Sequence, residues 1–402
     1  MGRKDSPPAI TTRFGGGSMS IQSSSSLIKA HSLTKTCYNQ FLYILIGDGG
    51  AVDMFELTFL GTSSGVPTKS RNVSGLAISL LGEQPKAGKS TPWILIDCGE
   101  GTQHRLLYTH HKPSMLRAIF ITHAHGDHCY GLLGLLSSLA MHGRKESLKL
   151  IAPASVLAFV CAGQALTQMN PSYALEMIEI EAVLSQGVRL EMGEQWRADV
   201  AIYPMSHRIE CYGFAITQQL DKLQLNTERL TQDGIDHSYW RRILKSGEPK
   251  ICTQNQIIYP SDYLNRSTIT QKIVIAGDND APKRLTDAVK DASLLIHEAT
   301  YTQAVMDKIL AKGVFDPQHS SAHAVGSFAD EMQVPNLILT HFSARFLNFD
   351  DPDSSKPNMG HIRAETESVY GGRLILAEDL MTVSITKEGI MSVHGAPDGL
   401  EI

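Results

Sequence analysis

The sequence lacks several features that would place the protein in a specialised class. Its six cysteines are scattered without a CxxC pair, so neither a disulfide framework nor a cysteine zinc site is indicated. No apolar run approaches the ~20 residues that span a bilayer, and no secretory leader opens the chain. With 402 residues, of which 42% are hydrophobic, the chain has enough apolar content for one large α/β domain. We expect it in the cytoplasm, with no membrane contact and with organellar import as the alternative.

The chain also lacks an excess of basic residues, because its formal net charge is −5. Binding RNA requires cations where the phosphates lie, so an acidic protein with one basic face remains compatible with an RNA substrate. The candidates for such a face are Arg144-Lys145, Arg241-Arg242, Lys245 and Lys250.

A histidine-rich segment follows the apolar residues 118–121, which predict a strand. Three histidines and one carboxylate, His123, His125, Asp127 and His128, fall within six positions. Imidazole nitrogen and carboxylate oxygen both suit Zn²⁺, and a loop after a rigid strand can direct side chains into two adjacent pockets. We expect His123 and His125 to bind one ion and Asp127 and His128 to bind its neighbour. Two ions need further ligands downstream.

Three later segments meet this need, because each is a short apolar run that ends in a ligand-type residue. They are residues 201–206 before His207, residues 272–277 before Asp278, and residues 337–340 before His341. Asp278 is the natural bridging ligand, since a carboxylate gives one oxygen to each of two ions held about 3.5–4 Å apart.

These motifs resemble the metallo-β-lactamase superfamily and, within it, the tRNase Z (ribonuclease Z, or RNase BN) family of tRNA 3′-processing endonucleases. The resemblance runs in family order from about residue 54 to the C-terminus. It rests on the segments 59–72, 94–103, 206–208, 212–214, 276–278, 297–301, 319–322, 339–346 and 377–379. It implies a four-layer αβ/βα sandwich with an inserted arm, a homodimer, and two Zn²⁺ ions per subunit. Mn²⁺ and Fe²⁺ suit the same ligand set.

The resemblance also implies the role of each site residue. One zinc ion would be bound by His123, His125, His207 and Asp278, and the other by Asp127, His128, Asp278 and His341.

Asp127 corresponds to the family's proton acceptor. His319 matches a histidine that protonates the leaving oxygen, oriented by Glu298; the alternative is that Glu298 and His319 form an ordinary supporting pair. Lys69 and Arg71 are expected to contact phosphates near the cleavage point. Hydrolysis would leave a 3′-hydroxyl on the tRNA and a 5′-phosphate on the trailer.

The domain boundaries follow from the same resemblance. Residues 1–53 lie outside it and form an extension that is expected to be disordered, whereas residues 54–402 form the nuclease domain. Within that domain, residues 218–266 are expected to form the arm. The arm carries Asp236-His237-Ser238 where the family has a Gly/Pro-rich motif, and Tyr239 and Trp240 are expected to anchor it.

Two other functions remain open from the sequence. The altered arm permits a zinc phosphodiesterase or exoribonuclease that acts on other RNA or on small phosphodiesters. A catalytically silent RNA-binding protein is the third hypothesis, and the complete set of metal ligands argues against it.

Overall fold

The computed structural model describes residues 53–81, 91–192, 196–245, 247–253, 256–313 and 316–395. The expected N-terminal extension therefore lies outside the described residues, except for Asp53, which begins the first strand. Residues 51–402 form one compact unit. None of the described helices is long and apolar enough to cross a membrane.

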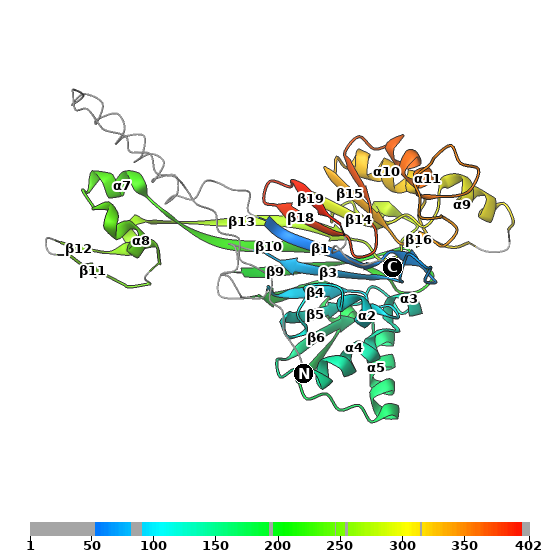
Figure 1. Ribbon diagram of the computed structural model, residues 1–402, viewed down its shortest axis with the longest axis horizontal. Helices are drawn as coiled ribbons and strands as arrows, with labels where there is room; N and C mark the ends of the chain where they lie inside the picture. Colours follow the sequence, from blue (N-terminus) through cyan, green and yellow to red (C-terminus); the bar gives the residue numbers. More distant parts are fainter. Residues whose placement is uncertain are drawn as a thin grey trace, which may run out of the picture. The chain divides into compact units, whose positions relative to one another are not determined.

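Two mixed β-sheets form the centre of this unit (Figure 1). The first sheet has the spatial order β19 (Met391–His394), β18 (Thr382–Thr386), β1 (Asp53–Gly61), β3 (Gly75–Leu80), β4 (Trp93–Ile96), β5 (Leu116–Phe120), β6 (Leu148–Ala152) and β7 (Leu175–Glu179). The second has the order β17 (Arg373–Leu376), β15 (Asn336–Thr340), β14 (Leu294–Glu298), β13 (Leu264–Ile275), β10 (Tyr212–Leu225), β9 (Trp196–Pro204) and β8 (Val188–Glu191).

The helices cover the outer faces of the two sheets, and three apolar cores hold the layers together. Phe120 of the first sheet and Phe214 of the second meet in the core between the sheets, with ring centroids 5.2 Å apart. Leu136 belongs to the core beneath the helices of the first sheet, and Phe328 to the core beneath those of the second. This arrangement confirms the four-layer αβ/βα sandwich. The covering helices are α4 (Leu132–Met141) and α5 (Ala154–Thr167) on the first sheet, and α10 (Ala322–Glu331) and α11 (Met359–Glu367) on the second.

Short elements complete the layers and the loops near the strand ends. They are β2 (Ser63–Ser64), α2 (Thr102–Leu106), α3 (Gly126–Cys129), α6 (Ile180–Val183), α9 (Gln303–Leu310) and β16 (Phe342–Ser343), together with the 3₁₀ turns Pro113–Met115, Pro260–Tyr263 and Pro282–Leu285.

The predicted arm is a long β-hairpin that carries its own small core (Figure 1). Strands β10 and β13 remain paired as far as Leu225 and Leu264, whereas β9 stops pairing with β10 at Leu220, so residues 221–268 form the free part of the arm. Trp240 is only 8% exposed in the tip core and donates its indole N–H to the Ile235 carbonyl over 3.1 Å, as expected of an anchoring residue. The tip contains α7 (Thr227–Gln232), α8 (His237–Lys245), β11 (Ile251–Cys252) and β12 (Ile257–Ile258).

Candidate metal centre

The carboxyl ends of several parallel strands meet at one edge of the two sheets and supply the candidate ligands. Strand β5 ends at Phe120 before the histidine-rich loop, and it runs parallel to β4. Strands β13, β14 and β15 are parallel to one another and lead towards Asp278, Glu298 and His341. Ligand sites of open α/β sheets lie outside such strand ends. The strands expected from the apolar runs are therefore present, and they bring residues distant in sequence together.

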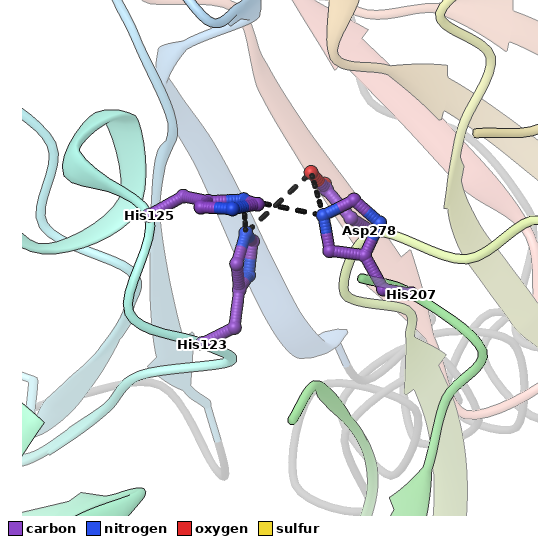
Figure 2. Close-up of side chains that lie close together, drawn as sticks. All are labelled: His123, His125, His207 and Asp278. Carbon is purple, nitrogen blue, oxygen red and sulfur yellow. Dashed lines mark hydrogen bonds and ion pairs between the residues drawn. The ribbon is translucent and has the colours of Figure 1, made fainter. Parts of the chain in front are cut away.

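The first cluster joins His123, His125, His207 and Asp278, whose side chains point toward one another (Figure 2). Nε2 of His123 lies 3.0 Å from Nδ1 of His125, and Nε2 of His207 lies 3.2 Å from the same Nδ1. The Asp278 Oδ2 oxygen faces Nε2 of His123 at 3.5 Å and Nε2 of His207 at 3.8 Å.

The second cluster joins Asp127, His128 and His341. The two Nε2 atoms of His128 and His341 are 3.2 Å apart, and Asp127 Oδ2 lies 3.5 Å from the first and 3.4 Å from the second. The other Asp278 oxygen, Oδ1, lies 3.5 Å from both Nε2 atoms. Asp278 thus turns one oxygen to each cluster, which is the arrangement a bridging carboxylate requires.

Contacts on the outer side of the imidazole rings fit this donor set. Nδ1 of His128 lies 2.7 Å from Asp97 Oδ2, Nδ1 of His207 lies 2.8 Å from the Gln318 carbonyl, and Nδ1 of His341 lies 3.1 Å from the Thr300 hydroxyl. A histidine that ligates a metal usually donates its other N–H to such an acceptor, which leaves the inward nitrogen unprotonated. Nitrogen atoms facing one another at about 3 Å are then best satisfied by a cation between them.

The charges of the centre agree with cation binding. Burial alone would raise the pKa of the Asp278 and Asp127 carboxyls, but the surrounding histidines outweigh it and hold both pKa values below the ordinary value. The largest histidine contribution comes from His341 for Asp278 and from His128 for Asp127. Burial lowers the pKa of His123, His125 and His207. The first cluster therefore offers neutral imidazoles beside the ionised Asp278, the forms in which both bind metals. In the second cluster burial disfavours the charged ring of His128, but Asp278, Asp97 and Asp127 outweigh it and raise the pKa of His128 to about 10.

Glu298 and His319 form a hydrogen-bonded pair beside the clusters, with 3.0 Å between His319 Nδ1 and Glu298 Oε1. Burial disfavours the charged ring, but the Glu298 carboxylate outweighs it and raises the pKa of His319 to about 9. Glu298 also accepts the backbone N–H of Asn279 at 3.1 Å and of Ser320 at 3.0 Å. A protonated His319 therefore stands at the centre, held in one orientation by a fixed carboxylate.

The two basic residues expected to contact phosphates lie in different environments. Lys69 is exposed on the loop after β2. Arg71 is only 4% exposed, donates to the Phe346 carbonyl, and lies with its guanidinium 5.9 Å from the Phe342 ring centroid. An enclosed guanidinium with internal acceptors does not reach a phosphate, so the position of Arg71 does not support the expected contact.

Arg144, a candidate for the basic face, is also buried, at 4% exposure. Its guanidinium donates to the carbonyls of Pro113, Leu116, Glu146 and Ser147 at 2.7–2.9 Å. The assignment of Arg144 to a phosphate-binding surface is therefore wrong, because its donors hold together a loop of the first sheet.

Two carboxylates that the sequence did not mark support the site. Asp97 accepts the Thr122 N–H at 2.8 Å and positions the ring of His128. Asp379 accepts the Thr62 hydroxyl at 2.8 Å and the Asn72 N–H at 2.7 Å, and so fastens both ends of the loop between them. The only sequence signal was that each occurs in a segment carrying the family resemblance.

That loop reaches the centre through Gly65, whose N–H donates to Asp127 Oδ2 over 2.7 Å. The loop and the clusters border a cleft of about 470 Å³ that is also lined by Tyr130, Arg208 and His319. A larger cleft of about 820 Å³, at the end of the second sheet where Ser293 and Pro335 lie, contains none of the clusters. The chemistry of the lining, rather than size, therefore identifies the candidate site.

Comparisons with known proteins agree with this geometry. A family profile described as a Beta-lactamase superfamily domain matches residues 92–223. The chain is 41% identical to Ribonuclease Z of Marinobacter nauticus over 336 residues, 83% of this chain and 97% of that protein. It is 36% identical to Ribonuclease BN of Escherichia coli O157:H7 over 317 residues, 78% of this chain and 95% of that protein. Its fold is similar to that of a metallo-β-lactamase fold protein of Bacillus subtilis, with a TM-score of 0.52 at 16% identity, covering 82% of this chain and 99% of that one.

Proposed function

The chain belongs to the ribonuclease Z family, and from this membership we propose that it is a metal-dependent endoribonuclease that removes 3′ trailers from precursor tRNA. The observation that carries the proposal is the pair of His/Asp clusters sharing Asp278 beside an open cleft. A phosphodiester is anionic and repels hydroxide, so its hydrolysis calls for cations that activate water and neutralise developing charge.

We propose Zn²⁺ as the divalent metal and two ions per subunit. His123, His125 and His207 would bind one, Asp127, His128 and His341 the other, and Asp278 both. When bound, the ions lower the pKa of water and stabilise charge on the phosphoryl oxygens. The all-nitrogen and oxygen donor set supports Zn²⁺ and also suits Mn²⁺ or Fe²⁺.

The residues around the ions would move the protons. Asp127 accepts a proton from the attacking water, and the Gly65 N–H holds its carboxylate in place. His319 donates a proton to the leaving 3′ oxygen, with Glu298 fixing the ring. The products are a tRNA with a 3′-hydroxyl and a trailer with a 5′-phosphate.

Substrate contacts outside the centre form part of the same proposal. Lys69 is exposed on the loop that Asp379 fastens, and in this proposal its ammonium group contacts a phosphate near the cleavage point. We assign Arg71 instead to anchoring that loop. A homodimer and a cytoplasmic location remain predictions; sedimentation equilibrium tests the first.

Cleavage of a 3′-extended precursor tRNA tests the function. Metal-loaded protein should cut once, just after the discriminator nucleotide, and leave a 3′-hydroxyl. Asp127→Ala should abolish the cut. Asp287→Ala should not, because that carboxylate is exposed and pairs with Lys290 at the surface. Absence of tRNA cleavage beside rapid hydrolysis of bis(p-nitrophenyl) phosphate would instead favour a phosphodiesterase acting on other substrates.

A further inference from the structure

An exposed aromatic ring lies beside the buried centre. Tyr130 directly follows α3, the short helix that carries Asp127 and His128, and it is 63% exposed. It lines the same cleft as His125, Asp127 and Asp278. Tyr130 belongs to none of the buried apolar cores of the described residues, so the ring is not needed there as a core residue.

The ring is nevertheless held in position. A Cβ atom on Gly126 would lie only 2.3 Å from the Tyr130 ring, so the ring rests against the backbone of the metal-binding loop. The Phe159 ring lies beside it, with centroids 6.0 Å apart and planes tilted by 40°. The Tyr130 hydroxyl makes no hydrogen bond to any residue that the structure describes. What Tyr130 offers to the cleft is therefore a fixed, solvent-facing aromatic surface.

We propose that Tyr130 is a stacking platform for the base of a nucleotide next to the scissile phosphate. The inference rests on the proposed RNA substrate. To reach ions held by largely buried ligands, the strand must enter the cleft unpaired, with its bases exposed. An aromatic side chain binds such a base through its π-face without selecting its sequence. The cleft volume of about 470 Å³ falls in the about 300–1,000 Å³ range of small-ligand sites, which fits nucleotides around the cut and not a tRNA body.

The alternative is that Tyr130 only shields the loop at Gly126. The two roles differ in what they predict for the substrate. A shielding ring would influence every substrate through metal binding, whereas a stacking ring couples to one particular base.

The experiment combines protein variants with base deletions. The value of kcat/KM is measured for zinc-loaded wild-type protein, Tyr130→Ala and Tyr130→Phe. The substrates are precursor tRNAs carrying an abasic nucleotide at the discriminator, at the first trailer position, or at neither. Tyr108→Ala is the matched control, since Tyr108 is 47% exposed and does not line the cleft. Zinc content is measured for every variant.

Stacking contributes about 1–3 kcal/mol per base, so Tyr130→Ala should lower kcat/KM about 5- to 150-fold on the intact substrate. With the wild-type protein, kcat/KM should be lower by a similar factor on one of the two abasic substrates than on the intact substrate. On that abasic substrate, Tyr130→Ala should cause no further loss of kcat/KM. Tyr130→Phe should match the wild type, because the hydroxyl has no assigned partner.

Three results would overturn the proposal: unchanged cleavage by Tyr130→Ala, losses that multiply at both abasic positions, or a loss that follows zinc content. If Tyr130→Ala does not fold, Tyr130→Leu serves in its place. Failure of this test leaves wild-type tRNA cleavage, and hence the proposed function, intact.

Discussion

Replacing Asp379 by alanine should lower the free energy of unfolding substantially, although Asp379 is not one of the proposed metal ligands. Its carboxylate is 3% exposed and pairs with Arg105 Nη2 at 3.0 Å, while also accepting bonds from Thr62 and Asn72. Burial raises the pKa of Asp379 despite these donors, so the ion pair adds little net stability over an apolar pair. Removing the carboxylate alone, however, leaves Arg105, 17% exposed, without its partner.

Breaking such a buried pair costs about 3–5 kcal/mol, a large share of the about 5–15 kcal/mol that stabilises a typical domain. Equilibrium unfolding in urea measures the loss. The control is Glu176→Ala, which breaks the exposed Lys149–Glu176 pair of 2.7 Å and should cost no more than about 1 kcal/mol. Adding Arg105→Leu to Asp379→Ala should recover part of the loss, because no guanidinium is then left unpaired.

Asp379→Ala should also slow catalysis, because Thr62 and Asn72 bracket the loop whose Gly65 N–H holds Asp127. The expected effect is a fall in kcat with a smaller change in KM on a short chromogenic substrate. A loss of stability below about 1 kcal/mol, or a double variant whose losses simply add, would refute this reasoning.

Three further predictions concern other parts of the molecule. Asp97→Asn should weaken zinc binding about 10- to 100-fold in a chelator competition, since Asp97 orients the His128 ring; unchanged affinity would contradict this role. Burial lowers the pKa of His111 to about 4 from 6.5. As the pH falls, the unfolded chain therefore binds this proton at a higher pH than the folded chain does. The free energy of unfolding should fall by about 3 kcal/mol between about pH 6.5 and about pH 4. His111→Gln should flatten that part of the pH profile measured by urea unfolding, and an unchanged slope would exclude His111 as its source. Removing the metal with a chelator should lower the midpoint of thermal unfolding, because an ion at 100 times its Kd stabilises the folded state by about 2.7 kcal/mol. Adding zinc should restore the midpoint. A midpoint that neither the chelator nor zinc changes would argue against metal binding to the folded state.

The candidate ligands could be anticipated from the sequence because two local signals coincide at each of them. An apolar run predicts a strand, and a histidine or aspartate after it is placed at the strand end, as for His207, Asp278 and His341. Strands β13 and β15 run parallel in the second sheet, and β9 is antiparallel to β10, which is itself antiparallel to β13, so all three strands end at the same edge. Both signals are local in the sequence, so the ligands can be predicted without knowing which strands are neighbours in the fold.

The supporting residues could not be found in this way, since their roles depend on partners distant in sequence. Arg71 is an ordinary loop arginine until the fold brings the Phe346 carbonyl to it, 275 residues later. Asp97 follows an apolar run as a turn residue would, and its role follows only from the pairing of β4 with β5. The prediction for Arg144 was wrong for the same reason. Two adjacent basic residues in the sequence, Arg144 and Lys145, give no sign of the backbone carbonyls that surround the Arg144 guanidinium in the fold.

The position of the centre has a consequence for how the fold and the activity depend on each other. His123 and His128 come from the first sheet, whereas His207 and His341 come from the second, and Asp278 contacts members of both groups. The ligand set is therefore complete only when the two sheets are packed on their shared core. An ion bound there would bridge the sheets as well as serve the reaction, so a variant that loosens the core between the sheets should weaken metal binding without changing any ligand. Activity lost in such a variant should return when the metal concentration is raised, which distinguishes it from the loss caused by Asp127→Ala.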